Sequence, residues 1–118
     1  MPVYGTCAGL ILLAKEIVGE NPHLGVINIK VKRNAYGRQL SSFSCNKYVE
    51  ELKKEIPLVF IRAPWIESVD EPARIILELD GRIVCARQDN ILVSSFHPEL
   101  TTDTTVHEYF INMIDESK

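Results

Sequence analysis

The stretch Gly5-Thr6-Cys7-Ala8-Gly9 decides how this sequence is interpreted, because it stands between a short apolar run and a helix-like run. Two glycines flank Cys7 at the spacing of a nucleophile elbow, G-x-S-x-G, with cysteine in place of serine. Such a strand-to-helix turn needs small neighbours, because its central residue has a strained backbone. The turn would place the thiol at a helix N-terminus, where the dipole favours the thiolate and the N–H of Ala8 faces a developing oxyanion. The alternative is a buried structural cysteine, and this segment alone does not choose between the two.

A second segment that carries chemistry is Phe96-His97-Pro98-Glu99, which follows an apolar, strand-like run at residues 91–96. In an extended segment, residues two apart share a face, and Pro98 biases His97 towards an extended conformation. Glu99 is therefore predicted to orient the imidazole while the other ring nitrogen faces Cys7. A thiol, an imidazole and a carboxylate are the parts needed for nucleophilic catalysis. The alternative interpretation is a polar loop after a strand.

Composition limits the class of protein. The chain has 118 residues, which indicates one domain, and it is 46% hydrophobic and 25% charged, as is typical of a soluble globular protein. A net charge of -3 argues against a nucleic-acid surface, and the sequence has no apolar run of the length that crosses a membrane. Cys7, Cys45 and Cys85 are widely spaced and form no C-x-x-C motif, which argues against a zinc site or a disulfide framework and favours the reducing cytosol. We expect Cys45 and Cys85 to lie in the core.

The remaining patterns predict an α/β fold with a mixed sheet. Residues 2–6 end a buried strand, residues 8–18 form a helix that is apolar nearly all round, and residues 27–31 alternate as a half-wet strand. The charged residues 47–55 are interpreted as a short helix or surface loop, and residues 58–61 as a strand. A hairpin joins residues 75–79 to residues 83–87 across Asp80-Gly81, a pair that type I′ turns favour. The last segment is an amphipathic helix, with Thr105 and Glu108 as a predicted capping box.

Two arginines stand at predicted strand ends or turns. Arg62 ends an apolar strand before Ala63-Pro64, and Arg33 precedes the turn at residues 34–37. A guanidinium in such a place either binds a carboxylate in fork geometry or is simply solvated. The residue pattern leaves both alternatives open.

Taken together, these segments resemble the class I (triad-type) glutamine amidotransferases, and within them the glutaminase subunits of pyridoxal 5'-phosphate synthase. The similarity begins with the cysteine turn and the apolar run after it. It continues in order through three further segments: Lys32-Arg33-Asn34-Ala35-Tyr36-Gly37-Arg38-Gln39 with Ser42-Phe43, Val59-Phe60-Ile61-Arg62-Ala63-Pro64, and Ser95-Phe96-His97-Pro98-Glu99-Leu100. His-Pro-Glu marks the wider class, and the arginine-bearing segments mark the vitamin B6 branch. The resemblance covers nearly the whole chain.

The resemblance implies a fold and a set of roles. Residues 1–118 are expected to form part of one flavodoxin-like glutamine amidotransferase type 1 domain, three-layered with a mixed sheet. Cys7 would be the nucleophile, His97 its base and Glu99 the orienting acid, with Ala8 as an oxyanion donor. The implied glutamine-pocket residues are Arg33, Ile61 and Arg62. The implied reaction hydrolyses L-glutamine to glutamate and ammonia, which passes to a separate (β/α)8-barrel synthase subunit, and it needs no metal or organic cofactor.

Two departures from the family pattern leave alternatives open. Nothing in the sequence matches the Gly-Gly-Glu-Ser loop that family members carry in a longer N-terminal part, where it supplies the second oxyanion donor. Residues 44–56 also fit the family pattern poorly. The chain is therefore expected to be incomplete at its N-terminus. The alternatives are an inactive remnant or fragment that lacks half the oxyanion hole, and another class I amidotransferase.

Overall fold

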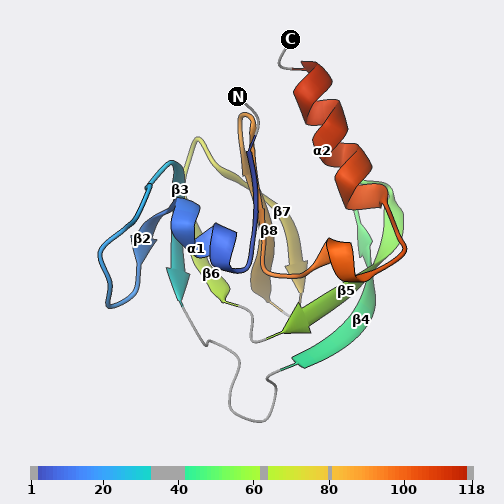
Figure 1. The fold of residues 1–118 in the computed structure, drawn as a ribbon, viewed down its shortest axis with the longest axis horizontal. Coiled ribbons are helices and arrows are strands. Elements are labelled where there is room, and N and C mark those ends of the chain that lie inside the picture. The colour runs from blue at the N-terminus through green and yellow to red at the C-terminus, as the bar shows by residue number, and fades with distance from the viewer. Residues whose placement is uncertain (1–2, 33–41, 62–63, 80, 117–118) are drawn as a thin grey trace.

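A computed structural model of the chain describes residues 3–32, 42–61, 64–79 and 81–116. These ranges contain short strands, two α-helices and one 3-10 helix, η1 (Figure 1). In chain order they are β1 (Val3–Thr6), α1 (Ala8–Leu13), β2 (Ala14–Ile17), β3 (Ile27–Lys32), β4 (Ser42–Val49), β5 (Lys54–Ile61), β6 (Trp65–Val69), β7 (Arg74–Leu79), β8 (Arg82–Gln88), β9 (Ile91–Ser94), η1 (Pro98–Leu100) and α2 (Thr105–Glu116).

The main sheet is mixed, as the sequence predicts. Its strand order is β1-β9-β8-β6-β3-β2, and β7 pairs with β8 outside this path. The pairs β1–β9 and β2–β3 are parallel, whereas β8 runs antiparallel to β6, β7 and β9. A separate antiparallel ribbon joins β4 to β5. The predicted α/β class is confirmed.

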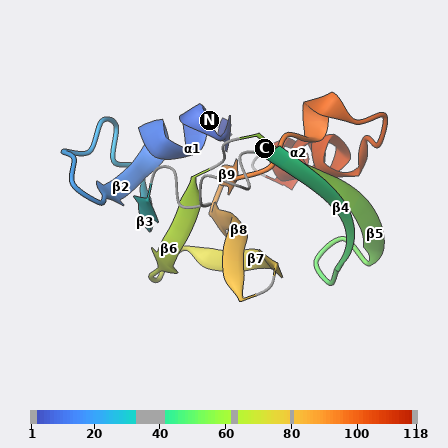
Figure 2. The same cartoon turned by 90° about the horizontal axis from the view of Figure 1, so that it is seen from below.

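Two apolar clusters lie on opposite sides of the central strands. Along β9, Leu92 belongs to the cluster with β4, β5 and α2, while the next residue, Val93, belongs to the cluster with α1, β2, β3 and β6. This alternation follows from the two-residue side-chain period of a strand. Figures 1 and 2 show α1 on one side of β1, and the β4–β5 ribbon and α2 on the other. The sheet is therefore covered on both faces, in three layers.

Several sequence predictions for single elements are confirmed. In β3 the buried residues Ile27, Ile29 and Val31 alternate with more exposed ones. The β7–β8 hairpin pairs residues 79 and 82 around Gly81, whose φ of 79° suits glycine. In α2, Val106 and Met113 are buried on one face, as the apolar spacing predicts.

The prediction of one helix over residues 8–18 is wrong. The chain turns extended at Ala14, and β2 then runs parallel to β3, with Val18 N–H bonded to the carbonyl of Val31 at 2.9 Å. One apolar cluster buries Leu10, Leu13 and Ile17. A helix followed by a strand therefore buries the apolar side chains of this run. The open edge of β3 supplies backbone partners, and this tertiary pairing overrides the local helical pattern.

Residues 47–55 are also misassigned from sequence. They form the end of β4, a turn and the start of β5, paired continuously from Val49↔Lys54 to Ser42↔Ile61. Lys53 makes the turn with a φ of 52°, and no Gly or Asn signals it. The strand that follows alternates cleanly, with Ile56, Leu58 and Phe60 buried. β6 was not predicted at all.

The start of α2 differs from the predicted capping box. Thr105 is already helical, and its N–H donates to the Asp103 carboxylate at 2.8 Å. Glu108 instead accepts from the hydroxyl of Thr104 at 3.3 Å. The cap therefore lies one to two residues earlier than the Thr105–Glu108 pair.

Among the described residues, no helix is both long enough and apolar enough to cross a membrane.

A polar network centred on Glu51 ties three parts of the fold together. Arg74 of β7 donates to both carboxylate oxygens of Glu51 in the β4–β5 turn, at 3.0 and 2.8 Å, and the Tyr109 hydroxyl of α2 donates to one of them at 2.8 Å. The bidentate bond from Arg74 is the main reason that the pKa of Glu51 falls from 4.5 to about 2. Arg87 adds a bond to the same tyrosine at 2.9 Å.

This network predicts a pH-dependent contribution to stability. Because the folded pKa of Glu51 is depressed, its contribution is present above pH 4.5 and is lost as the pH falls towards about 2. Arg74 is 52% exposed, so screening reduces the contribution to about 1 kcal/mol. Urea unfolding is expected to show that loss for Glu51→Gln at pH 7, and a difference from the parent that shrinks between pH 4.5 and pH 3. Glu55→Gln, which neutralises an exposed glutamate on β5, is the matched control. A Glu51→Gln effect that does not change with pH would contradict the assignment.

Candidate active site

Cys7 occupies the junction between β1 and α1 in a strained backbone conformation. Its φ is 47° and its ψ is -100°, a region that residues with a Cβ rarely adopt. Its N–H donates to the carbonyl of Ser94 at 3.0 Å, and its carbonyl accepts the N–H of Ile11 at 3.2 Å. The turn is thus held between β9 on one side and the first turn of α1 on the other. The strand-to-helix turn predicted from Gly5 and Gly9 is confirmed.

Gly5 permits this turn because β1 and α1 approach each other very closely. A Cβ at Gly5 would lie 2.8 Å from both the carbonyl carbon and the oxygen of Gly9, and 2.8 Å from Cδ1 of Leu13. Such distances leave no space for a side chain. Gly9 itself faces open space, since a Cβ there meets nothing within 4 Å. Of the two flanking glycines, only Gly5 is required by packing.

His97 follows β9 and reaches the cysteine from the opposite segment of chain. Its N–H donates to the carbonyl of Val59 in β5 at 2.8 Å, and its carbonyl accepts from Leu100 at the end of η1 at 3.2 Å. The 3-10 turn over Pro98–Leu100 replaces the extended segment expected after His97. The argument that His97 and Glu99 share a face of an extended strand is therefore wrong. Pro98 suits the first position of a helical turn because its φ is fixed there and no N–H is needed.

The sulfur and the imidazole are in direct contact. Cys7 Sγ lies 3.0 Å from Nε2 of His97 and 3.2 Å from the carbonyl oxygen of Ser95, to which it can donate. Both residues are half-buried, so the pair is reachable from solvent. A thiol in contact with an imidazole nitrogen can transfer its proton and act as a nucleophile. The predicted proximity of Cys7 and His97 is confirmed by this distance.

Ala8, the predicted oxyanion donor, is the first residue of α1 and is exposed. An N–H in the first turn of a helix has no partner within the helix, so it is available to an acceptor placed beside Cys7.

The structure describes the other predicted site residues only in part. Ile61 ends β5, is 45% exposed, and lies two residues after Val59, whose carbonyl holds His97. Arg33 and Arg62 fall outside the described residues, and so does the side chain of Glu99. Their predicted roles stay predictions.

The other two cysteines differ from Cys7 in surroundings. Cys85 is buried in β8, and desolvation raises the pKa of its thiol to about 12. Cys45 is half-buried in β4 and packs against the same apolar cluster. The prediction of a core position is confirmed for Cys85 and holds in part for Cys45.

Sequence reasoning missed two buried serines beside the Cys7–His97 pair. Ser94 and Ser95 are both 0% exposed, and they are the buried polar residues of the described part of the chain. A signal was present, because two hydroxyl-bearing residues interrupt the apolar run 91–96 just before His97. No group of His, Cys, Asp or Glu in the described ranges is arranged to hold a metal ion.

Comparison with known proteins identifies the family. Residues 1–116 match the sequence profile of the SNO glutamine amidotransferase family. The chain belongs to this family. A crystal structure of a glutamine amidotransferase superposes with a TM-score of 0.87 at 48% identity, covering 93% of this chain and 59% of that one. This agreement supports the flavodoxin-like α/β fold of the class I amidotransferases.

Curated relatives carry the name pyridoxal 5'-phosphate synthase subunit PdxT. The protein from Clostridium beijerinckii is 54% identical over 113 residues, which is 94% of this chain and 60% of the relative. The protein from Clostridium botulinum is 53% identical over an alignment of 120 positions, which covers 100% of this chain and 62% of the relative. The chain thus spans about three fifths of the length of these relatives.

Proposed function

We propose that this chain is the glutamine-hydrolysing part of a pyridoxal 5'-phosphate synthase, with Cys7 as nucleophile. The observation that supports this most strongly is the 3.0 Å contact between Cys7 Sγ and His97 Nε2 at a strained strand-to-helix turn. Membership of the SNO family and similarity to the PdxT proteins support glutamine as the substrate. Residues 1–118 then belong to one amidotransferase type 1 domain that works in the cytosol.

The first half of the reaction forms a thioester. His97 takes the thiol proton, and the Cys7 thiolate attacks the side-chain amide carbon of glutamine, so that a C–S bond forms and the carbonyl oxygen becomes negative. The N–H of Ala8 stabilises this oxyanion. The imidazolium of His97 then protonates the amide nitrogen, the C–N bond breaks, and ammonia leaves.

The second half regenerates the enzyme. His97 removes a proton from water, which attacks the thioester carbon and forms a second oxyanion beside Ala8. The C–S bond breaks, glutamate leaves, and the proton held by His97 returns to Cys7. The balance is one glutamine and one water consumed, with one glutamate and one ammonia produced. No metal or organic cofactor takes part in these steps.

The remaining predicted residues complete this proposal. Glu99 orients the imidazole and stabilises the imidazolium, while Arg33, Ile61 and Arg62 line the glutamine pocket. Ammonia passes to a (β/α)8-barrel synthase subunit in this proposal, and the name of the PdxT relatives, a subunit of pyridoxal 5'-phosphate synthase, supports work with a partner subunit. The alternatives, an inactive remnant and another class I amidotransferase, are separated from this proposal by the measurements below.

Selective labelling is the first expected outcome. A glutamine-mimicking diazo-ketone is expected to modify Cys7 faster than Cys45 or Cys85, because only Cys7 combines an adjacent imidazole with a position at a turn. The Cys85 thiol, with a pKa of about 12, stays protonated at pH 8. Mass spectrometry of the labelled peptides measures the order. Protection by free glutamine is the control, and equal labelling of all three cysteines would contradict the assignment.

The decisive experiment is glutamate release from the full protein that carries this chain, with and without the barrel synthase subunit. Glutamate production that depends on that subunit supports the proposal. Release without any dependence on the synthase favours another amidotransferase. An intact, folded protein that labels at Cys7 but releases no glutamate favours the inactive remnant.

A further inference from the structure

Ser94 lies fully buried beside the Cys7–His97 pair, yet it has no part in the mechanism above. It is the last residue of β9, in register with Thr6 of β1 on one side and Cys85 of β8 on the other. Its carbonyl accepts the N–H of Cys7 at 3.0 Å, and its hydroxyl lies 3.0 Å from the carbonyl oxygen of Phe96 and 3.1 Å from the hydroxyl of Tyr4. One residue therefore touches the backbone at both Cys7 and the residue before His97.

The direction of these hydrogen bonds follows from the number of protons. A carbonyl oxygen only accepts, so the single hydroxyl proton of Ser94 goes to Phe96. The Tyr4 hydroxyl must then donate to Ser94 Oγ. The result is a chain of donors that runs from Tyr4 through Ser94 to the carbonyl of Phe96.

The acceptor of this chain is the peptide group that carries His97. Ser94 holds the oxygen of that peptide, and Val59 of β5 holds its N–H at 2.8 Å. A peptide group is planar, so holding both ends fixes the plane from which the imidazole projects towards Cys7. The Phe96 side chain is buried at 1% exposure, which also keeps water from replacing the serine hydroxyl.

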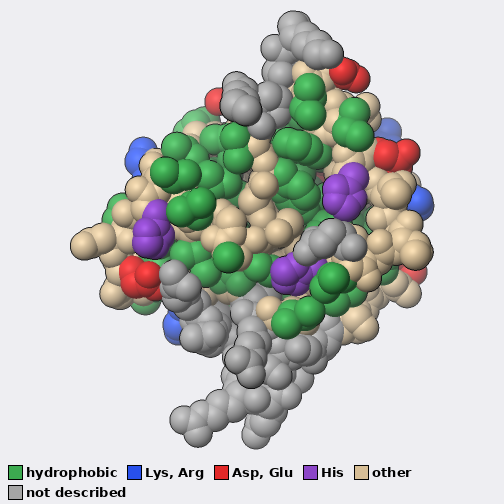
Figure 3. Space-filling view, in the orientation of Figure 1, with side chains coloured by type: hydrophobic (Ala, Val, Ile, Leu, Met, Phe, Trp, Pro, Cys, Tyr) green, Lys and Arg blue, Asp and Glu red, His purple; other side chains and the backbone are tan. Residues whose placement is uncertain are grey.

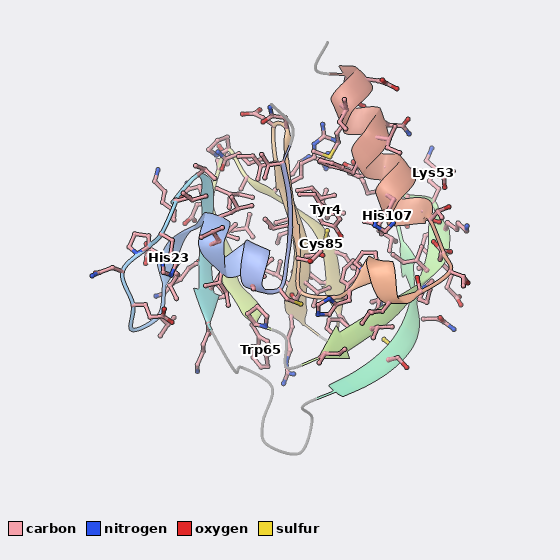
Figure 4. The ribbon with its side chains drawn as sticks, viewed as in Figure 1. Tyr4, His23, Lys53, Trp65, Cys85 and His107 are labelled. Atoms are coloured by element: carbon pink, nitrogen blue, oxygen red, sulfur yellow. The ribbon has the colours of Figure 1, made fainter. Side chains whose placement is uncertain are left out.

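Tyr4 connects this arrangement to α2. Its ring packs against Phe110 with centroids 5.5 Å apart and meets His107 edge-on at 6.5 Å. Figure 4 shows Tyr4 beside β1 with His107 next to it on α2, and Figure 3 shows hydrophobic side chains gathered along this face. The position of the phenol is thus set by the terminal helix as well as by β1.

We propose that Ser94 is a positioning residue, which fixes the imidazole of His97 against the Cys7 thiol with its hydroxyl oriented by Tyr4. Ser94 touches no reacting atom and acts through the 96–97 peptide. This inference rests on the proposed function where it concerns turnover, but its effect on the thiol is measurable without glutamine. Without the Ser94 hydroxyl, the Phe96 carbonyl loses its hydrogen-bond donor. The 96–97 peptide is then less firmly held, and the distance from the His97 imidazole to the Cys7 sulfur is expected to increase.

The test measures, in the full protein, the pH dependence of Cys7 alkylation by iodoacetamide and the kinetics of glutamate release. Ser94→Ala is expected to lower kcat about tenfold, with KM within about twofold of the parent, because the base is misplaced and the pocket is not. The midpoint of the alkylation profile is expected to rise by about half a pH unit or more, since the Cys7 sulfur loses its close contact with Nε2 of His97. Ser94→Thr keeps the hydroxyl and is expected to restore both values.

Two controls separate positioning from loss of stability. Val93→Ala removes apolar volume from the neighbouring buried position of β9, on its other face, and is expected to lower the melting temperature while the alkylation midpoint stays unchanged. Tyr4→Phe keeps the ring but removes the hydroxyl that donates to Ser94, and it is expected to raise the midpoint by a smaller amount. Tyr109→Phe is the matched control, because the Tyr109 hydroxyl bonds Glu51 and not Ser94. This variant is expected to leave the alkylation midpoint unchanged.

The outcomes distinguish this inference from the proposed function. An unchanged alkylation midpoint in Ser94→Ala overturns the positioning role, whatever glutamate release does. If Ser94→Ala does not fold, an unchanged midpoint in Tyr4→Phe overturns it equally. Undiminished glutamate release from a Cys7→Ala protein removes the proposed function, while a raised midpoint in Ser94→Ala would still support the positioning of the thiol–imidazole pair.

Discussion

Replacing Cys7 with alanine is expected to abolish glutamate release, with a fall in kcat of about a thousandfold or more. The reason is chemical, because the Cys7 thiol lies 3.0 Å from Nε2 of His97, which can take its proton. Residues that act as one catalytic unit lose nearly all of their effect when the nucleophile is removed. The measurement is glutamate release by the full protein in the presence of the synthase subunit, at saturating glutamine.

Two further variants make this result specific. Cys45→Ala changes a half-buried thiol on β4 and is expected to keep activity within about twofold of the parent. Glu99→Ala is expected to reduce kcat less than Cys7→Ala does, because an orienting carboxylate makes and breaks no bond. Glutamate release by Cys7→Ala at the rate of the parent would remove the mechanism, and an equal loss in Cys45→Ala would point to general destabilisation.

The Cys7–His97 pair was predictable because each residue stands in a short segment with its own local signal. Flanking glycines mark the turn at Cys7, and Pro98 marks the break after β9. The contact between the two segments was not derivable from spacing, since 90 residues separate them and only the parallel pairing of β1 with β9 brings them together. The resemblance to the amidotransferases supplied that link. Ser94 was missed because its interruption of the apolar run marks the position but does not show that its hydroxyl bonds Tyr4 and Phe96, which the fold brings beside it.

The fold divides in the same way between local and long-range causes. The β7–β8 hairpin and α2 follow from a turn pair and a helical apolar spacing, both of which are local. The end of α1 at Leu13 is different, because it depends on the edge of β3 offering backbone partners to β2. The β4–β5 ribbon is hard to predict from sequence because its outer residues are charged and because Lys53 makes its turn without a glycine. The prediction of helix or strand fails where pairing with a distant segment, and not the local pattern, supplies the backbone hydrogen bonds.

Gly5→Ala is expected to be strongly damaging, although Gly5 lies outside the Cys7–His97 pair. Its new Cβ would stand 2.8 Å from the backbone of Gly9 and from Leu13 Cδ1, so β1 and α1 must separate. Overpacking of this kind costs about 1–3 kcal/mol, and backbone atoms cannot rotate away as a flexible side chain can. Cys7 lies between the two elements that separate, so its contact with His97 is expected to be lost along with stability. We expect a fall in kcat of about a hundredfold.

Gly9→Ala provides the matched control, because it adds the same methyl group four residues later. A Cβ at Gly9 meets nothing within 4 Å, and the residue lies in α1, where alanine is preferred to glycine by about 1 kcal/mol. Thermal unfolding is therefore expected to shift downwards for Gly5→Ala and to stay level or rise for Gly9→Ala. Iodoacetamide alkylation of Cys7 in the same samples reports the contact with His97 directly. Equal melting temperatures for the two variants would mean that β1 and α1 are not held as close as the distances at Gly5 require, and the strained turn would lose its main structural explanation.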